Sequence, residues 1–205
     1  MSFAPRLVTP ASPPVPALQD RALDNLRYIR ETMERAGSFT AISGAGMVAS
    51  GGVAIVAAAA TWGRPLDHRW VTSWLVAAVV AALINIGAIV RKARRAGAPL
   101  LSGAGRKLFV NLLPAMFIGA LLTIVLQHAG DAALLPGVWL LLYGAAVVAG
   151  GAYSVRSIPA MGVCFLALGT AALFAPAAWA NAFMAAGFGA AHLAFGGLVA
   201  RRYGG

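Results

Sequence analysis

The last apolar segment of the chain, AAGFGAAHLAFGGLVARR at residues 185–202, has the composition of a helix that ends at a membrane surface. Its residues are apolar or small up to two closing arginines, which anchor such a helix at the lipid phosphates. One histidine, His192, lies in the apolar stretch, between Gly189 and Gly196 on a face of small residues. Small residues allow transmembrane helices to approach closely. The segment therefore predicts the inner half of a transmembrane helix whose histidine faces other helices.

The rest of the chain has the same character, and this sets the fold class. Of its 205 residues, 60% are hydrophobic and 11% are charged, whereas a soluble domain carries about 25% charged residues. Six segments within residues 42–202 are long enough to cross a hydrocarbon core of about 30 Å. We expect an all-α integral membrane protein with six transmembrane helices, at about 42–62, 70–90, 108–128, 137–155, 158–176 and 181–200.

The basic residues predict the orientation, because cytoplasmic loops are enriched in Lys and Arg. If the N-terminus is cytoplasmic, every Lys and Arg except Arg64 and Arg69 falls on the inner side. The pattern predicts three antiparallel hairpins with both the N-terminus and the C-terminus cytoplasmic. Tryptophan prefers the lipid–water boundary, and all the tryptophans lie near proposed outer helix ends, namely Trp62, Trp70, Trp74, Trp139 and Trp179.

Two segments precede the transmembrane domain. Residues 1–18 are rich in proline and have no long apolar stretch, so we expect a disordered leader. Residues 19–37 are expected to form an amphipathic cytoplasmic helix, which either rests on the inner leaflet or docks a cytoplasmic partner. Its apolar stripe recurs at three- and four-residue spacing and consists of Leu23, Leu26, Ile29 and Met33.

The small residues of the first span predict its place in the bundle. This span contains no leucine, and Gly46, Ser50 and Ala54 lie four residues apart on one face. Helix association in lipid depends on close packing of small residues. We therefore expect the first span inside the bundle, and we expect the leucine-rich third and fourth spans to face lipid.

His192 has polar neighbours at a similar depth. At about 1.5 Å per residue it lies about 12 Å above the inner helix end, level with Ser50, Asn85 and Cys164 on other spans. One hypothesis is packing, with neutral His192 hydrogen-bonded to Ser50. The alternative is a polar path through these residues that conducts protons, because imidazole titrates near neutrality. No cofactor or metal is expected, since the other histidines lie toward the outer side and no Cys/His cluster exists.

The second inner loop, residues 91–107, is strongly basic and contains no acidic residue. It is typical of a topology signal, and it is also a candidate surface for anionic lipid headgroups or an acidic partner. Nucleic acid is not expected, because no aromatic or folded reader accompanies the charge. The candidate lipid contacts are Arg91, Lys92, Arg94, Arg95, Arg106 and Lys107.

The third hairpin contains the segment GVCFLALGTAALFAPAAWANAFMAAGFGAAHLAFGGLVARR, which consists of two glycine-spaced helices joined by an Ala-Pro turn. Over residues 158–202 the chain resembles the HdeD-like family of small bacterial inner-membrane proteins associated with acid resistance. The resemblance implies a bacterial inner-membrane location and a three-hairpin architecture, and it implies no catalytic residue. The long basic loop and the N-terminal helix depart from that family.

Two functions follow from these observations. No Ser/His/Asp or Cys/His arrangement can be recognised, so we expect a protein that is not an enzyme. The first hypothesis is a structural or stress-associated membrane protein that contacts lipid, a cytoplasmic partner or a second copy of itself. The second is a small transporter or proton-linked channel with a path around His192. A polar cavity reaching His192 would favour transport, and a closed contact of small residues would favour the structural role.

Overall fold

A computed structural model describes residues 20–21, 23–29, 42–95, 104–151 and 154–203, without the side chains of residues 104–109. Within these ranges the chain forms helices and no strand. The chain divides into two compact units, Met1–Phe39 and Thr40–Gly205.

In the first unit, residues 20–21 and 23–29 are helical. Leu23, Leu26 and Ile29 of the predicted stripe are exposed within this unit, and Met33 lies outside the described residues. Asp24 and Arg27 form an exposed ion pair at 3.1 Å. The expected leader at residues 1–18 also lies outside the described residues.

The second unit contains six helices that are long and apolar enough to cross a membrane. They confirm the prediction of an all-α, polytopic membrane protein. The first five helices are α2 (Gly44–Thr61), α3 (His68–Arg95), α4 (Ala104–Ala129), α5 (Leu135–Gly151, preceded by the short turn η1, Ala132–Leu134) and α6 (Ser157–Phe174). The sixth is one continuous run of η2 (Ala177–Trp179), α7 (Ala180–Met184), η3 (Ala185–Ala191) and α8 (His192–Tyr203).

The segment η3 is a π-helix inside this last run. In a π-helix the backbone hydrogen bonds join residues five apart, so each turn holds one more residue than an α-helical turn. All its residues except Phe188 are Ala or Gly. The π-helix ends at His192, the first residue of α8.

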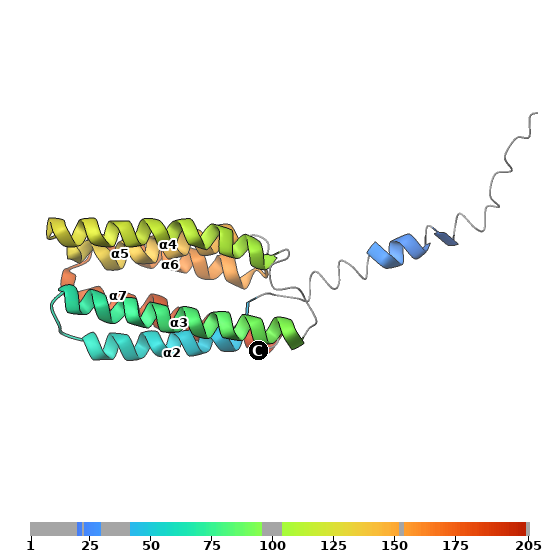
Figure 1. Ribbon diagram of the computed structural model, residues 1–205, viewed down its shortest axis with the longest axis horizontal. Helices are drawn as coiled ribbons and strands as arrows, with labels where there is room; N and C mark the ends of the chain where they lie inside the picture. The colour runs from blue at the N-terminus through green and yellow to red at the C-terminus, as the bar shows by residue number, and fades with distance from the viewer. Residues whose placement is uncertain (1–19, 22, 30–41, 96–103, 152–153, 204–205) are drawn as a thin grey trace, which may run out of the picture. The chain divides into compact units, whose positions relative to one another are not determined.

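The six helices form two groups of three (Figure 1). In one group α2 packs against both α3 and the η3–α8 run, and in the other α5 packs against both α4 and α6. The two groups meet where the last run contacts α5 and α6. The pairs α2–α3 and α4–α5 are antiparallel hairpins, whereas the closest partner of α6 is α5.

Glycines bring α5 and α6 together at two levels. A methyl group added at Gly144 would lie 2.9 Å from the carbonyl oxygen of Gly162, and one added at Gly162 would lie 2.9 Å from that of Gly144. A methyl group added at Gly169 would lie 3.0 Å from the carbonyl oxygen of Gly137. The two helices are therefore in backbone contact, which only glycine permits here.

Helix α2 uses glycines in the same way against the last run. A methyl group at Gly51 would lie 2.9 Å from the carbonyl oxygen of Gly189, and one at Gly196 would lie 3.0 Å from that of Gly44. Another face of α2 meets α3, where Ser50 donates a hydrogen bond to Ala81. Half of the α2 span is buried, compared with 11% of the α3 and α4 spans. The predicted interior position of the first span is confirmed.

The prediction that the fourth span faces lipid is wrong. Leu135 and Leu140 of α5 are fully buried, and α5 lies between α4 and α6. Leucine does not distinguish the two environments, because lipid tails and a protein interior are equally apolar. The third span, α4, does expose its large side chains, including Leu113 and Phe117.

The tryptophans near the proposed outer helix ends differ in exposure. Trp62 and Trp179 are exposed, but Trp70 and Trp74 are buried. The ring of Trp139 stacks on that of Trp70 with centroids 5.7 Å apart. These three indoles pack against one another between helices, and the fully buried indole of Trp70 has an acceptor for its N–H.

Asn181 supplies that acceptor and joins three helices at one end of the bundle. Its Oδ1 accepts hydrogen bonds from the indole Nε1 of Trp70 and the hydroxyl of Thr61, both at 2.9 Å. Its Nδ2 donates to the backbone carbonyl of Thr61 at 2.7 Å. Asn181 therefore connects the last run to α2 and α3.

The loop between α2 and α3 ends in a side-chain cap. The carboxylate of Asp67 accepts hydrogen bonds from the backbone N–H groups of Arg69 and Trp70, both at 3.0 Å. The bond from Trp70 is the main reason that the pKa of Asp67 lies below its usual value. A negative charge here also interacts favourably with the N-terminus of α3.

Candidate functional site

A groove with a volume of about 370 Å³ lies between the two groups of helices, and its lining is mostly apolar. Along α3 the lining extends from Trp74 to Ile89, a length of about 22 Å at about 1.5 Å per residue. On α4 the lining runs from Leu112 to Thr123. The groove is thus long and narrow and runs parallel to the helix axes.

The groove opens sideways between α3 and α4. These two helices are not among the closely packed pairs of the bundle. Lining residues on both of them are exposed, including Leu75 and Ile86 on α3 and Met116 on α4. Both helices are long and apolar enough to cross a membrane.

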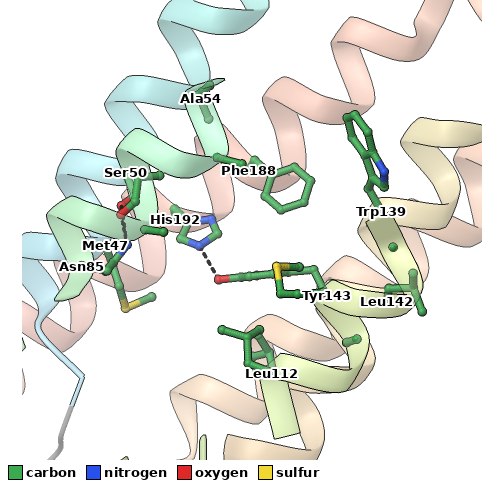
Figure 2. A pocket seen from close by; sticks show the side chains of 18 of the residues that line it. Met47, Ser50, Ala54, Asn85, Leu112, Trp139, Leu142, Tyr143, Phe188 and His192 are labelled. Atoms are coloured by element: carbon green, nitrogen blue, oxygen red, sulfur yellow. Dashed lines mark hydrogen bonds between the residues drawn. The ribbon is translucent and has the colours of Figure 1, made fainter. Parts of the chain in front are cut away.

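His192 and Tyr143 form a hydrogen-bonded pair on the groove wall (Figure 2). The Tyr143 hydroxyl and the His192 Nε2 atom lie 2.8 Å apart, and the tautomer of the imidazole decides which of them donates. His192 is 6% exposed. Its Nδ1 atom is buried and has no hydrogen-bond partner of normal geometry in the described part of the chain.

Aromatic rings hold the His192 imidazole in place. Its ring centroid lies 5.4 Å from that of Tyr143, 5.5 Å from that of Phe165 and 6.3 Å from that of Phe188. Tyr143 itself packs against Phe165 with ring centroids 4.8 Å apart. Packing of this kind fixes side-chain orientation, so the polar atoms of the pair are preorganised.

A second polar pair lies on the other side of His192 (Figure 2). The Asn85 amide donates one hydrogen bond to the Ser50 hydroxyl and another, of 3.0 Å, to the carbonyl of Ala81. The Ser50 hydroxyl donates to the same carbonyl. These bonds link α2 to α3, so this pair is satisfied within the protein.

The far end of the groove is lined by indole rings. The Trp139 Nε1 atom donates to the Thr123 hydroxyl at 2.9 Å, which joins α5 to α4. The Thr123 hydroxyl donates in turn to the carbonyl of Gly119. Trp74 completes this end, and its buried Nε1 has no hydrogen-bond partner within the described residues.

The structure places the expected neighbours of His192 as follows. His192, Ser50 and Asn85 line the same groove. The expected His192–Ser50 hydrogen bond is wrong, because Tyr143 occupies Nε2 of His192 and Asn85 engages Ser50. Cys164 is exposed on the outer face of α6 and does not line the groove. The depth of Cys164 along its helix matches that of His192, but depth does not determine which way a residue faces around the helix axis.

The basic residues at the inner end of α3 fall into two sets. Arg91, Arg94 and Arg95 are exposed. Lys92 is partly buried, and its Nζ donates to the backbone carbonyls of Ile42 at 3.1 Å and Tyr203 at 3.4 Å. Lys92 therefore connects α3 to the beginning of α2 and the end of α8. The side chains of Arg106 and Lys107 lie outside the described ones.

Sequence reasoning missed Tyr143, Trp139 and Thr123. Tyr143 follows Trp139 by four residues, so the two lie on one face of α5. This spacing was a usable signal for a polar face on an otherwise leucine-rich span. Nothing in the sequence paired that face with His192.

Among the described residues, no group of three or more His, Cys, Asp or Glu side chains is placed to hold a metal ion. Comparisons with protein-family models, curated proteins and solved structures give no match to this chain. The groove and its polar pairs are therefore the basis for any functional assignment.

Proposed function

We propose that this polytopic membrane protein is not an enzyme and that it binds a lipid-like molecule, which enters the groove from the bilayer between α3 and α4. The observation that carries the proposal is the apolar groove of about 370 Å³ that opens between two membrane-spanning helices. Its volume lies within the range of about 300–1,000 Å³ typical of ligand sites.

The lining favours an apolar ligand over a stream of ions or water. No Asp, Glu, Lys or Arg is among the described lining residues. The Ser50–Asn85 and Thr123–Trp139 pairs are satisfied within the protein. A conducting path needs polar groups that face water along its length, so the groove supports lipid contact better than the transport alternative.

The exposed arginines add a second contact with lipid to the proposal. Arg91, Arg94 and Arg95 at one end of α3 suit anionic headgroups of an inner leaflet. This part of the proposal includes a bacterial inner-membrane location with cytoplasmic termini. The HdeD-like resemblance, the stress role and the cytoplasmic partner remain predictions from the sequence.

Photo-crosslinking tests the proposal in nanodiscs of phosphatidylethanolamine and phosphatidylglycerol. Two probes are used, a long alkane and the same chain ending in a hydroxyl, each with a diazirine in the chain. We expect at least one probe to label the groove residues of α3 and α4 more strongly than it labels Val56, an exposed residue of α2. Equal labelling of all lipid-facing surfaces by both probes would contradict the proposal.

A matched pair of variants distinguishes the groove from the general lipid surface. Gly119 lines the groove, and a methyl group there would approach only Leu142, at 3.5 Å. Gly119→Leu therefore places a bulky side chain in the groove and is expected to reduce labelling several-fold. Gly87→Leu is the control, because nothing lies within 4 Å of a methyl group at Gly87. Unchanged labelling in Gly119→Leu would contradict binding of the probe in the groove.

A further inference from the structure

We propose that the groove selects a neutral, single-chain lipid that carries one hydroxyl group, bound at the Tyr143–His192 pair. This inference rests on the proposed function and names the chemical class of its ligand. Its basis is the preorganised polar pair on the wall of an uncharged, one-chain-wide groove.

The polar pair must provide the selectivity because the apolar lining provides little. A hydrocarbon chain gains no hydrophobic free energy when it moves from lipid into an equally apolar groove. Every bilayer chain therefore competes for the apolar wall on similar terms. A hydrogen bond that bulk lipid tails cannot offer is the feature that discriminates.

The groove accommodates one chain. A volume of about 370 Å³ spread over a length of about 22 Å suits one extended hydrocarbon chain rather than two. The Ser50–Asn85 pair lies near one end, since Asn85 is four residues from Ile89 and eleven from Trp74, and the Thr123–Trp139 pair lies at the other end.

The ligand is neutral because the groove supplies no countercharge. The described lining residues include no formally charged Asp, Glu, Lys or Arg side chain. An ion placed there would lose its hydration without gaining an opposite charge, which is costly. An uncharged polar group loses less and can recover the loss through one or two hydrogen bonds.

A hydroxyl fits the Tyr143–His192 pair in either tautomer. If Tyr143 donates to Nε2, its phenolic oxygen still has a lone pair and can accept a hydrogen bond. If Nε2 carries the hydrogen, the Tyr143 hydroxyl is free to donate. A ligand hydroxyl both donates and accepts, so it complements both arrangements.

Competition for the photoreactive alcohol tests this inference. We expect unlabelled cetyl alcohol to displace the alcohol probe from the groove about threefold to tenfold better than hexadecane, the range of one hydrogen bond in a membrane. Cetyltrimethylammonium should compete no better than hexadecane. This comparison uses the wild-type protein and needs no variant.

A matched pair of variants locates the effect. Tyr143→Phe removes the hydroxyl while leaving the ring that packs on Phe165, and should abolish the preference for the alcohol. Tyr203→Phe removes a hydroxyl outside the groove lining and should leave the preference intact. A preference retained in Tyr143→Phe would overturn the assignment of the pair.

The outcomes separate this inference from the proposed function. Groove labelling that cetyl alcohol and hexadecane suppress equally would overturn the inference and leave the proposed function standing. Stronger suppression by the cationic amphiphile would also overturn it. Failure of both probes to label the groove, or crosslinks between two copies through α3 and α4, would overturn both.

Discussion

At the scale of single residues, Asn181 is a buried polar side chain that connects three helices. It holds the indole of Trp70 and both the hydroxyl and the backbone carbonyl of Thr61. Asn181 orders three helices, because an apolar side chain of similar volume would leave the buried N–H of Trp70 without its acceptor, whereas the Thr61 hydroxyl keeps its bond to the carbonyl of Ala57.

We therefore predict that Asn181→Leu lowers the free energy of unfolding by about 1–2 kcal/mol, from hydrogen bonds that average about 0.6 kcal/mol in membranes. Thr61→Val should cost less, because Asn181 keeps its bond to Trp70. Thr72→Val is the control, since Thr72 is exposed and bonds only within its own helix. Reversible unfolding in mixed micelles measures the free energy of unfolding of each variant. A loss in Thr72→Val as large as the loss in Asn181→Leu would refute the prediction.

The sequence shows which side chains are polar but not which of them meet. His192, Ser50 and Asn85 were singled out and do line one groove. The partner of His192 was missed, because depth along a helix is readable from residue number whereas rotation about its axis is not. Cys164 illustrates the same limit, since it has a matching depth but faces outward.

At the scale of helices, glycine contacts hold the pairs together. Gly44 and Gly51 lie seven residues apart on α2, as do Gly137 and Gly144 on α5. A seven-residue spacing returns to nearly the same helix face after two turns. Each pair is thus a line of backbone contact, α2 with the last run and α5 with α6.

We predict that Gly144→Ala destabilises the protein by about 1–3 kcal/mol, the usual cost of overpacking. The added methyl group would lie 2.9 Å from backbone atoms of α6 on the opposite helix, so the helices must separate. Gly197→Ala serves as the control because nothing lies within 4 Å of its methyl group. Thermal unfolding in detergent gives the comparison, and equal stability of the two variants would count against close α5–α6 packing.

The spans themselves were predictable, since an apolar length is a local property of the chain. The burial of α5 was not, because a leucine-rich helix suits both lipid and a protein interior. The π-helical turn was also invisible, since Ala and Gly are compatible with either helix type.

At the scale of the whole molecule, charge and packing determine different features of the fold. The distribution of Lys and Arg predicts which end faces the cytoplasm, and the packing determines which helices are neighbours. The pairing of α2 with the last run joins segments far apart in the chain, and no sequence pattern pointed to it.

We predict that a membrane-impermeant maleimide labels Arg64→Cys but not Arg94→Cys in intact cells, both built on Cys164→Ser. Arg64 lies in the α2–α3 loop on the predicted outer side, and Arg94 lies at the opposite end of α3. Both side chains are exposed, so accessibility differs only through the membrane. After permeabilisation both should react, and the reverse pattern in intact cells would invert the orientation.

The π-helical turn determines how the two halves of the last run are rotated relative to each other about the helix axis. Asn181 before it faces Trp70 and Thr61, while Gly196 after it faces Gly44. Deleting one residue from Ala185–Ala191 would let the turn become α-helical and rotate one half against the other by about 100°. A shortened chain could then keep the asparagine contact or the glycine contact, but not both. The extra residue of this turn thus keeps both contacts on the side of the last run that faces α2.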